Sequence, residues 1–139
     1  MPRILIAEDE AHILRVMSLW LGRQGHEIIE TPNGAVALER LEHESVDLII
    51  SDMNMPVKSG WDLVRTMRED RGSDVPILLL TARCDQEKLS KQLAPYHVHL
   101  YPKPFVPSRL VADIDRLLGV PPDPRPPTPH GAAFREMRP

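Results

Sequence analysis

Short apolar runs alternate along this chain with segments whose apolar residues recur every three or four positions. Five runs have the length and composition of β-strands: 3–7, 27–30, 46–51, 75–80 and 97–101. Five segments between and after them have helical spacing: 11–21, 35–41, 61–68, 85–93 and 107–118. Strand and helix therefore alternate five times, which predicts an α/β fold with a doubly wound parallel sheet.

Individual segments add detail to this prediction. The run 75–80 is apolar on both faces, which is typical of a central parallel strand covered by helices on both sides. Polar flanks around 27–30 indicate an edge strand. Asn33 is a candidate N-cap for the helix that follows it, and Gly119 is a candidate C-cap for the last helix.

Polar residues follow the predicted strands at the points where the strands end. Glu8 and Asp9 follow the first strand, Asp52 the third, Thr81 the fourth and Lys103 the fifth. Right-handed crossovers bring the carboxyl ends of parallel strands to one edge of the sheet, and open α/β sheets bind ligands there. We therefore expect these side chains to lie close together if the first and third strands are neighbours.

The residue types in this group favour phosphoryl chemistry. Three neighbouring carboxylates repel one another unless a cation lies among them, and oxygen ligands with open positions suit Mg²⁺. A lysine and a hydroxyl group on the other side are suited to bind an anion. Asp52 is then the candidate nucleophile, which would form an acyl phosphate.

Composition limits the compartment and the classes of partner that we expect for this protein. The 139 residues carry a net charge of -3 and a pI near 6.1, which gives no electrostatic reason to expect nucleic acid or an anionic membrane as partner. The single cysteine, Cys84, excludes an internal disulfide bond and fits a reducing compartment. The first apolar run is too short for a signal peptide, and no run approaches the ~20 residues that span a bilayer. We expect a cytoplasmic protein.

In combination, these motifs resemble the response-regulator receiver domains of two-component signalling, in particular single-domain chemotaxis receivers. The resemblance covers roughly residues 3–119 and depends on four motifs in order. They are the acidic pair Glu8-Asp9, the loop Asp52-x-x-Met55-Pro56-x-x-x-Gly60, the strand end Thr81-Ala82 and Lys103-Pro104-Phe105.

The resemblance implies a flavodoxin-like (βα)5 fold with strand order 2-1-3-4-5, and it implies roles for the polar group. Asp52 would accept the phosphoryl group from a histidine kinase or phosphotransfer protein. Mg²⁺ would be bound by the side chains of Asp9 and Asp52 and by the backbone carbonyl of Asn54, with Glu8 acting through water. Thr81 would hydrogen-bond the phosphoryl group, Lys103 would pair with it, and the Lys103-Pro104 bond would be cis. Output would be a protein–protein contact at the face of helix four, strand five and helix five.

The sequence departs from the family pattern near the fifth strand. The family usually has an aromatic residue three positions before the lysine, where this chain has Leu100. Tyr101 is one position later, so it points to the opposite face of the strand. Pro95, Tyr96 and His97 replace the usual Gly-Ala pair. We therefore expect intact phosphorylation chemistry, a distorted approach to strand five and an altered readout.

Other functions stay open at this stage. One alternative is a pseudo-receiver that binds a partner without being phosphorylated. It would not need Glu8, Asp9 and Asp52, so their presence argues against it, whereas Leu100 and the altered approach to strand five keep it open. A small phosphohydrolase would typically carry an acid two residues after its nucleophile, where this chain has Asn54. Arg83 and Asn54 either control the access of water to a phosphoryl group on Asp52 or are simply solvent-exposed side chains, and the sequence favours neither interpretation.

The end of the chain differs in composition from the rest. We expect a receiver domain over 1–119 and a proline-rich tail over 120–139. The tail holds six prolines between Pro121 and Pro129 and is expected to be extended.

Overall fold

The computed structural model describes residues 2–119, and the predicted tail lies outside the described residues. The strands are β1 (Arg3–Ala7), β2 (Glu27–Thr31), β3 (Leu48–Asp52), β4 (Ile77–Ala82) and β5 (His99–Lys103). The α-helices are α1 (Ala11–Arg23), α2 (Gly34–His43), α3 (Gly60–Arg65), α4 (Gln86–Leu93) and α5 (Pro107–Leu118). A π-helical turn, Thr66–Asp70, extends α3, and two short 3-10 turns flank α4 at Arg83–Asp85 and Ala94–Tyr96.

The strands form one parallel sheet in the order β2-β1-β3-β4-β5, which confirms the predicted fold and strand order. Strand β2 is an outermost strand of the sheet, as its polar flanks indicate. The first and third strands are neighbours, with Ala7 level with Ser51. The residues that follow β1 therefore reach the same edge of the sheet as the end of β3.

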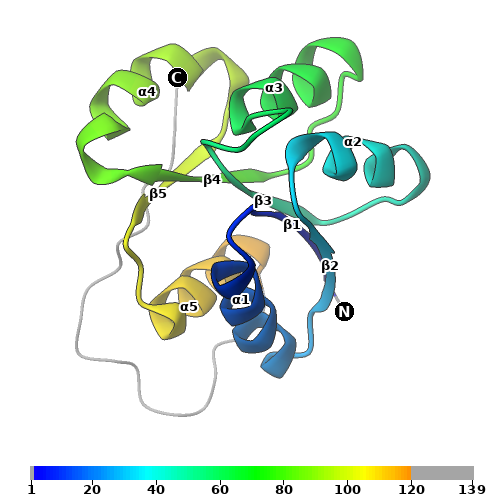
Figure 1. The fold of residues 1–139 in the computed structure, drawn as a ribbon, viewed down its shortest axis with the longest axis vertical. Coiled ribbons are helices and arrows are strands. Elements are labelled where there is room, and N and C mark those ends of the chain that lie inside the picture. Colours follow the sequence, from blue (N-terminus) through cyan, green and yellow to red (C-terminus); the bar gives the residue numbers. More distant parts are fainter. Residues whose placement is uncertain (1, 120–139) are drawn as a thin grey trace.

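Helices cover both faces of the sheet (Figure 1), with α1 and α5 on one face and α2, α3 and α4 on the other. Alternate residues of each strand point to opposite faces, so the core forms two clusters. Leu5, Ile49 and Leu79 belong to the cluster under α2, α3 and α4. Ile6 and Ile50 belong to the cluster against α1 and α5. No described helix is long and apolar enough to cross a membrane.

Three strands begin and end about two residues later than the apolar runs predict. Strand β4 begins at Ile77, just after Pro76, which has no N–H to donate to a ladder. Strand β5 begins at His99 because His97 has a positive φ of 52° at the end of a 3-10 turn. Strand β3 continues to Asp52 because backbone pairing with Leu80 does not depend on side-chain polarity. Polar residues thus form the strand tips and do not merely follow them.

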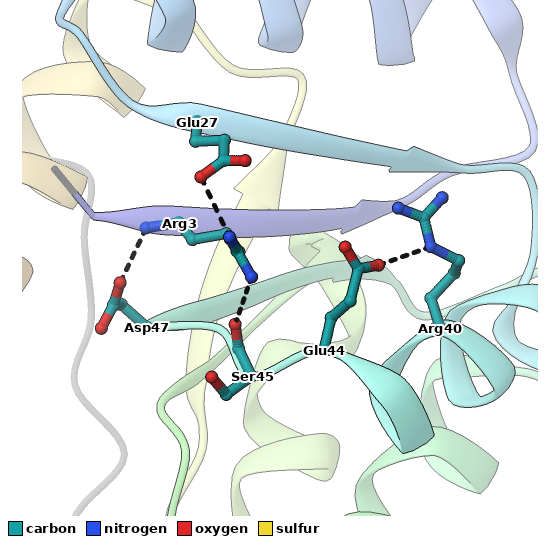
Figure 2. Close-up of polar contacts among 6 residues, drawn as sticks. All are labelled: Arg3, Glu27, Arg40, Glu44, Ser45 and Asp47. Carbon is teal, nitrogen blue, oxygen red and sulfur yellow. Dashed lines mark hydrogen bonds and ion pairs between the residues drawn. The ribbon is translucent and has the colours of Figure 1, made fainter.

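At the opposite edge of the sheet, Arg3 joins the beginnings of three strands (Figure 2). Its Nε donates to Glu27 Oε2 at 3.1 Å, and its Nη1 donates to the Ser45 carbonyl oxygen at 3.4 Å. Its backbone N–H donates to Asp47 Oδ2 at 2.7 Å. Arg40 and Glu44 form a separate pair at 2.6 Å. The Arg3 contacts thus connect β1 with β2 and with the segment before β3, at the end of the sheet opposite to the strand tips Asp52, Thr81 and Lys103.

The segment before strand five, where the sequence departs from the family pattern, is held by contacts with α3 and the π-helical turn that extends it. Helix α4 ends in the turn Ala94–Tyr96, and the Arg68 side chain then binds the chain that follows. Its Nε donates to the Tyr96 carbonyl oxygen at 2.8 Å and its Nη2 to that of His97 at 3.3 Å. The ring of Tyr96 meets that of Trp61 edge to face, with centroids 5.7 Å apart. The junction between α4 and β5 is therefore attached to α3.

Candidate functional site

Strand periodicity places three of the predicted site residues on one face. Glu8, Asp52 and Lys103 each extend the alternation of strand residues that face α1 and α5. Their strands end at the same edge, so their side chains converge although Glu8 and Lys103 are 95 residues apart. The fold itself therefore assembles the group.

An ion-pair network connects these side chains. Lys103 Nζ lies 3.1 Å from Asp52 Oδ1 and donates to Glu8 Oε1 at 3.3 Å. Asp9 adds a third carboxylate, and one oxygen from each of the three acids lies within 4.8 Å of the others. Glu8 and Asp52 are buried and Asp9 is exposed. The cluster is thus open to solvent on the Asp9 side.

The electrostatics of the cluster follow from burial and crowding. Burial first, and then the charge of Asp52, raise the pKa of Glu8 to about 7, against the lowering effect of Lys103. For Lys103, burial acts to lower the pKa, but the hydrogen bond and charge of Asp52, together with Glu8, raise it overall. Lys103 is therefore held as a cation, while the carboxylates lack full neutralisation by protein groups.

The donor set of this cluster fits Mg²⁺. Oxygens bound to Mg²⁺ lie about 2.1 Å from it, so trans ligands are about 4.2 Å apart. The present limit of 4.8 Å among the three carboxylates requires only small side-chain adjustments. A divalent cation would also relieve the repulsion that raises the pKa of Glu8.

Thr81 lies in β4, one position beyond the residue that pairs with Asp52, so it is at the same end of the sheet as the cluster. Thr81 is 2% exposed, and its Oγ1 has no hydrogen-bond partner among the described residues. A buried hydroxyl group without a partner is costly, by about 1–3 kcal/mol, and calls for an explanation such as a ligand. Asn54 lies two residues after Asp52, with its side chain exposed.

The loop between β3 and α3 is held by close packing at two glycines. A Cβ on Gly60 would lie 2.7 Å from the Asp52 carbonyl oxygen, and the Gly60 N–H donates to the Met53 carbonyl oxygen at 3.0 Å. A Cβ on Gly34 would lie 2.5 Å from the Lys58 carbonyl oxygen, to which the Gly34 N–H donates at 3.2 Å. Only glycine allows these approaches.

A capping box fixes the beginning of α3 just beyond this loop. Ser59 Oγ accepts from the Asp62 N–H at 3.2 Å, and the Asp62 carboxylate accepts from the Ser59 N–H at 3.0 Å. The Ser59 N–H and, at 3.1 Å, the Ser59 hydroxyl both donate to the Asp62 carboxylate, and these two hydrogen bonds lower the pKa of Asp62. The loop that carries the residues after Asp52 is therefore fixed at its far end.

The fifth strand places its two central residues as their parity predicts. Leu100 is 1% exposed in the cluster under α3 and α4, and Tyr101 packs on the α5 side. Tyr101 donates its hydroxyl to Asp113 Oδ2 of α5 at 2.9 Å. Burial and that carboxylate raise the pKa of the Tyr101 phenol. The Lys103-Pro104 peptide bond is cis, as the resemblance implies.

Sequence reasoning missed several contacts around the site. The Gly34–Lys58 packing, the Arg68 contacts and the buried pair His26–Asp115, with Nε2 and Oδ1 2.6 Å apart, all join distant parts of the chain. No periodicity or local motif marks them. For His26 the sequence signal is only a histidine in a turn between a helix and a strand.

Comparisons with known proteins agree with this geometry. The family model of the response regulator receiver domain matches residues 4–115. The chain is 35% identical over 116 residues to the two-component response regulator PhoP of Pseudomonas aeruginosa, covering 84% of this chain and 51% of that protein. It thus spans about half the length of such curated relatives.

Solved structures give the same result. The chemotaxis response regulator CheY4 of Vibrio cholerae superposes with a TM-score of 0.74 at 31% identity, covering 84% of this chain and 98% of that one. The receiver domain of the sensor histidine kinase PA1611 from Pseudomonas aeruginosa, solved with a magnesium ion in its active-site cleft, gives 0.71 at 26%, covering 85% and 98%. The chain therefore belongs to the response regulator receiver domain family of two-component systems.

Proposed function

We propose that Asp52 accepts a phosphoryl group from the phosphohistidine of a sensor kinase or phosphotransfer protein. The observation that carries this proposal is the meeting of Asp52, Lys103 and the acids Glu8 and Asp9 at one edge of the sheet. In this step an Asp52 carboxylate oxygen forms a bond to phosphorus while the phosphorus–nitrogen bond of the donor breaks. The electron pair of that bond stays on the imidazole.

The chain's own groups would stabilise the transferred phosphoryl group. Lys103 already contacts Asp52, so its ammonium group is placed to pair with phosphoryl oxygens on that carboxylate. The unpaired Thr81 hydroxyl would gain a hydrogen-bond acceptor once those oxygens arrive. Phosphoryl transfer requires mainly positioning and charge neutralisation, and these residues supply both.

We propose Mg²⁺ as the cofactor, bound by the carboxylates of Asp9 and Asp52 and the backbone carbonyl of Asn54, with Glu8 acting through water. When bound, the ion supplies positive charge that neutralises phosphoryl oxygens. The magnesium ion in the related PA1611 receiver domain supports this assignment.

We further propose that the receiver signals in the cytoplasm by phosphorylation-dependent contact with a partner protein, at the face of α4, β5 and α5. The receiver family consists of signalling switches, which supports this output over turnover of a substrate. Leu100 fills the space where the family usually has an aromatic residue, and Tyr101 is bonded to α5 instead. The switch is therefore expected to act without an aromatic partner for Thr81.

The test is incubation with acetyl phosphate, with and without Mg²⁺, followed by intact mass measurement. The beryllofluoride mimic is added separately and followed by tryptophan fluorescence. Trp61 follows Gly60 directly and is the expected reporter, so Trp61→Phe should abolish the fluorescence response. We expect a Mg²⁺-dependent phosphoryl adduct that is lost in Asp52→Asn.

Asp47→Asn is the matched control. Asp47 is also an aspartate beside β3, but it is exposed at the opposite edge of the sheet and bonded to Arg3. It should leave the adduct intact. A folded protein without adduct or metal response would refute the proposal in favour of a pseudo-receiver. Sustained hydrolysis of p-nitrophenyl phosphate would favour the phosphohydrolase.

A further inference from the structure

A hollow of about 480 Å³ opens between the end of α2 and the π-helical turn that extends α3. Its apolar lining consists of Leu41, Val46, Met67 and Val75, which come from four separate segments of the chain. Leu41, Val46 and Val75 are only partly buried, and they pack against the core cluster under α2, α3 and α4. Concave apolar surface with a polar rim is typical of interaction sites, and this volume is within the range of ligand pockets.

The polar rim of this hollow is acidic on balance. Glu42 and Glu44 are opposed by Arg71 alone, so these two acids and one arginine give a net charge of -1 with His43 neutral. The Glu42 side chain is 59% exposed, and its contact with Arg71 Nη2 is long, at 3.5 Å. A carboxylate can accept several donors, so Glu42 has room for a second cation. The hollow therefore suits a segment that combines large apolar side chains with basic ones.

One wall of the hollow is an unusual element. Met67 belongs to the π-helical turn Thr66–Asp70, and such turns are rare and occur frequently at functional sites. Methionine is flexible and polarisable, and it is common at binding surfaces that adapt to their ligand. Helix α3 begins near Asp52, and its π-helical extension leads towards the beginning of β4, away from the acidic cluster. The candidate phosphorylation site thus does not explain this turn.

Helix α5 ends at the same edge of the sheet as the hollow. Asp115, in the last turn of α5, lies 2.6 Å from His26, which directly precedes β2. Val46 and Val75 each lie two residues before a strand, β3 and β4 respectively. The end of α5 and the hollow are therefore both at the edge where the strands begin, on opposite faces of the sheet (Figure 1).

The chain that follows α5 is long enough to cross this edge. A helix with its side chains is about 10–12 Å across, so helix axes on opposite faces of a sheet are roughly 20 Å apart. Residues 121–129 include six prolines, and ten residues of polyproline conformation span about 31 Å. A spacer over 120–129 can therefore bring the segment 130–139 to the hollow.

The segment 130–139 has the chemistry that the hollow suits. It carries two large apolar residues, Phe134 and Met137, and two basic residues, Arg135 and Arg138. Each pair is three positions apart, a spacing that would place its two members on the same side of a helical turn. The two arginines and Glu136 give the segment a net charge of +1 with its histidine neutral. This charge is opposite to that of the lining.

We propose that the segment 130–139 docks in this hollow of its own chain, with Phe134 and Met137 against the apolar lining and an arginine beside Glu42. A tether of this length gives an effective concentration of about 1 mM. A segment that binds with a Kd of about 100 μM would then be docked in about 90% of the chains. Docking would cover a surface of α2 and α3 that is otherwise open to other proteins. The inference goes beyond the proposed function, because the hollow lies at the edge opposite to Asp52.

The experiment compares how close the segment lies to two points at this edge. A nitroxide is attached to the full chain carrying Cys84→Ser and Pro139→Cys, so that it reacts with one cysteine. NMR then records the broadening of the backbone amides of Ser73, which lines the hollow, and Gly22, near the end of α1 on the face of α5. We expect stronger broadening at Ser73. An undocked segment attached to α5 would broaden Gly22 at least as much.

Substitutions on both sides of the contact carry matched controls. Phe134→Ser should reduce the broadening at Ser73 by about half or more, because a tenfold weaker contact leaves about half of the chains docked. Phe134→Leu should retain most of it. Glu42→Arg should also reduce it, whereas Glu69→Arg should not. Glu69 is similarly exposed, at 51%, and has a similar contact with an arginine, at 3.4 Å, but it does not line the hollow.

Three results would overturn the docked segment. They are broadening at Gly22 equal to or stronger than at Ser73, no effect of Phe134→Ser, and equal effects of Glu42→Arg and Glu69→Arg. Mixing isotope-labelled chains with unlabelled chains that carry the nitroxide provides a further test. Broadening at Ser73 in that mixture would assign the hollow to a second copy and would also overturn the inference. A protein that forms no adduct with acetyl phosphate would refute the proposed function and leave this inference standing.

Discussion

Replacing Gly60 by alanine would place a methyl carbon 2.7 Å from the Asp52 carbonyl oxygen and 3.0 Å from Met53 Cα. Both atoms belong to the backbone of the buried β3 end, so neither moves by a simple side-chain rotation. Such overpacking costs typically about 1–3 kcal/mol. Gly60 is the first residue of α3, so the gain of about 0.5–1 kcal/mol for alanine in the middle of a helix does not apply, and we expect a loss of about 1–3 kcal/mol.

Gly22 provides a matched control within the same fold. It lies in α1, and a Cβ placed there meets nothing within 4 Å. Gly22→Ala should therefore raise the free energy of unfolding by about 0.5–1 kcal/mol. The two variants carry the same chemical change and should shift stability in opposite directions.

Urea denaturation followed by circular dichroism measures both shifts. Intact mass after acetyl phosphate treatment gives a second readout, because the added methyl group displaces the carbonyl of Asp52 itself. Gly60→Ala should slow adduct formation several-fold, whereas Gly22→Ala should not. If Gly60→Ala proves as stable as the unaltered protein or more so, the close packing described for this loop is wrong.

Three further substitutions test single contacts by urea denaturation. Tyr101→Phe removes the donor at 2.9 Å from buried Asp113 and should cost about 1–3 kcal/mol; no loss would show that Asp113 does not need this partner. His26→Ala leaves the Asp115 carboxylate without its 2.6 Å partner and should cost about 1.5–3 kcal/mol, and a neutral result would contradict a buried pair. Asn33→Ala removes the side-chain oxygen that accepts a hydrogen bond from the Val36 N–H at the beginning of α2, and it should cost about 1 kcal/mol. A cost near zero would mean that α2 does not depend on this cap.

Local patterns in the sequence predicted the elements of this fold well. Apolar runs and helical spacing reflect which face of each segment is buried, so five strands and five helices could be located. Asn33 could be predicted as an N-cap because capping is a local interaction: its side chain accepts from the N–H of a residue only three positions away. The ends of β3, β4 and β5 were predicted one or two residues too early because backbone pairing continues through polar residues. Their starts were predicted two residues too early, for β4 because of Pro76 and for β5 because of the turn that ends at His97.

The polar group at the sheet edge was predicted by a topological rule. Once the strands are parallel and connected by right-handed crossovers, their carboxyl ends must share an edge, so Glu8, Asp52 and Lys103 could be expected together. Strand parity likewise separated Leu100 from Tyr101. Whether Asp52 is phosphorylated stays a prediction for the acetyl phosphate experiment.

The sequence by itself thus determined the order of elements, the sheet and the residues of the candidate site. Only the tertiary structure decided the contacts between segments far apart in the chain, such as His26 with Asp115 and Gly34 with Lys58. It also decided the backbone conformation of the loop after β3, where Val57 has a positive φ of 69°. The physical reason is that periodicity encodes which faces are buried, whereas distances between loops depend on how all the elements pack together.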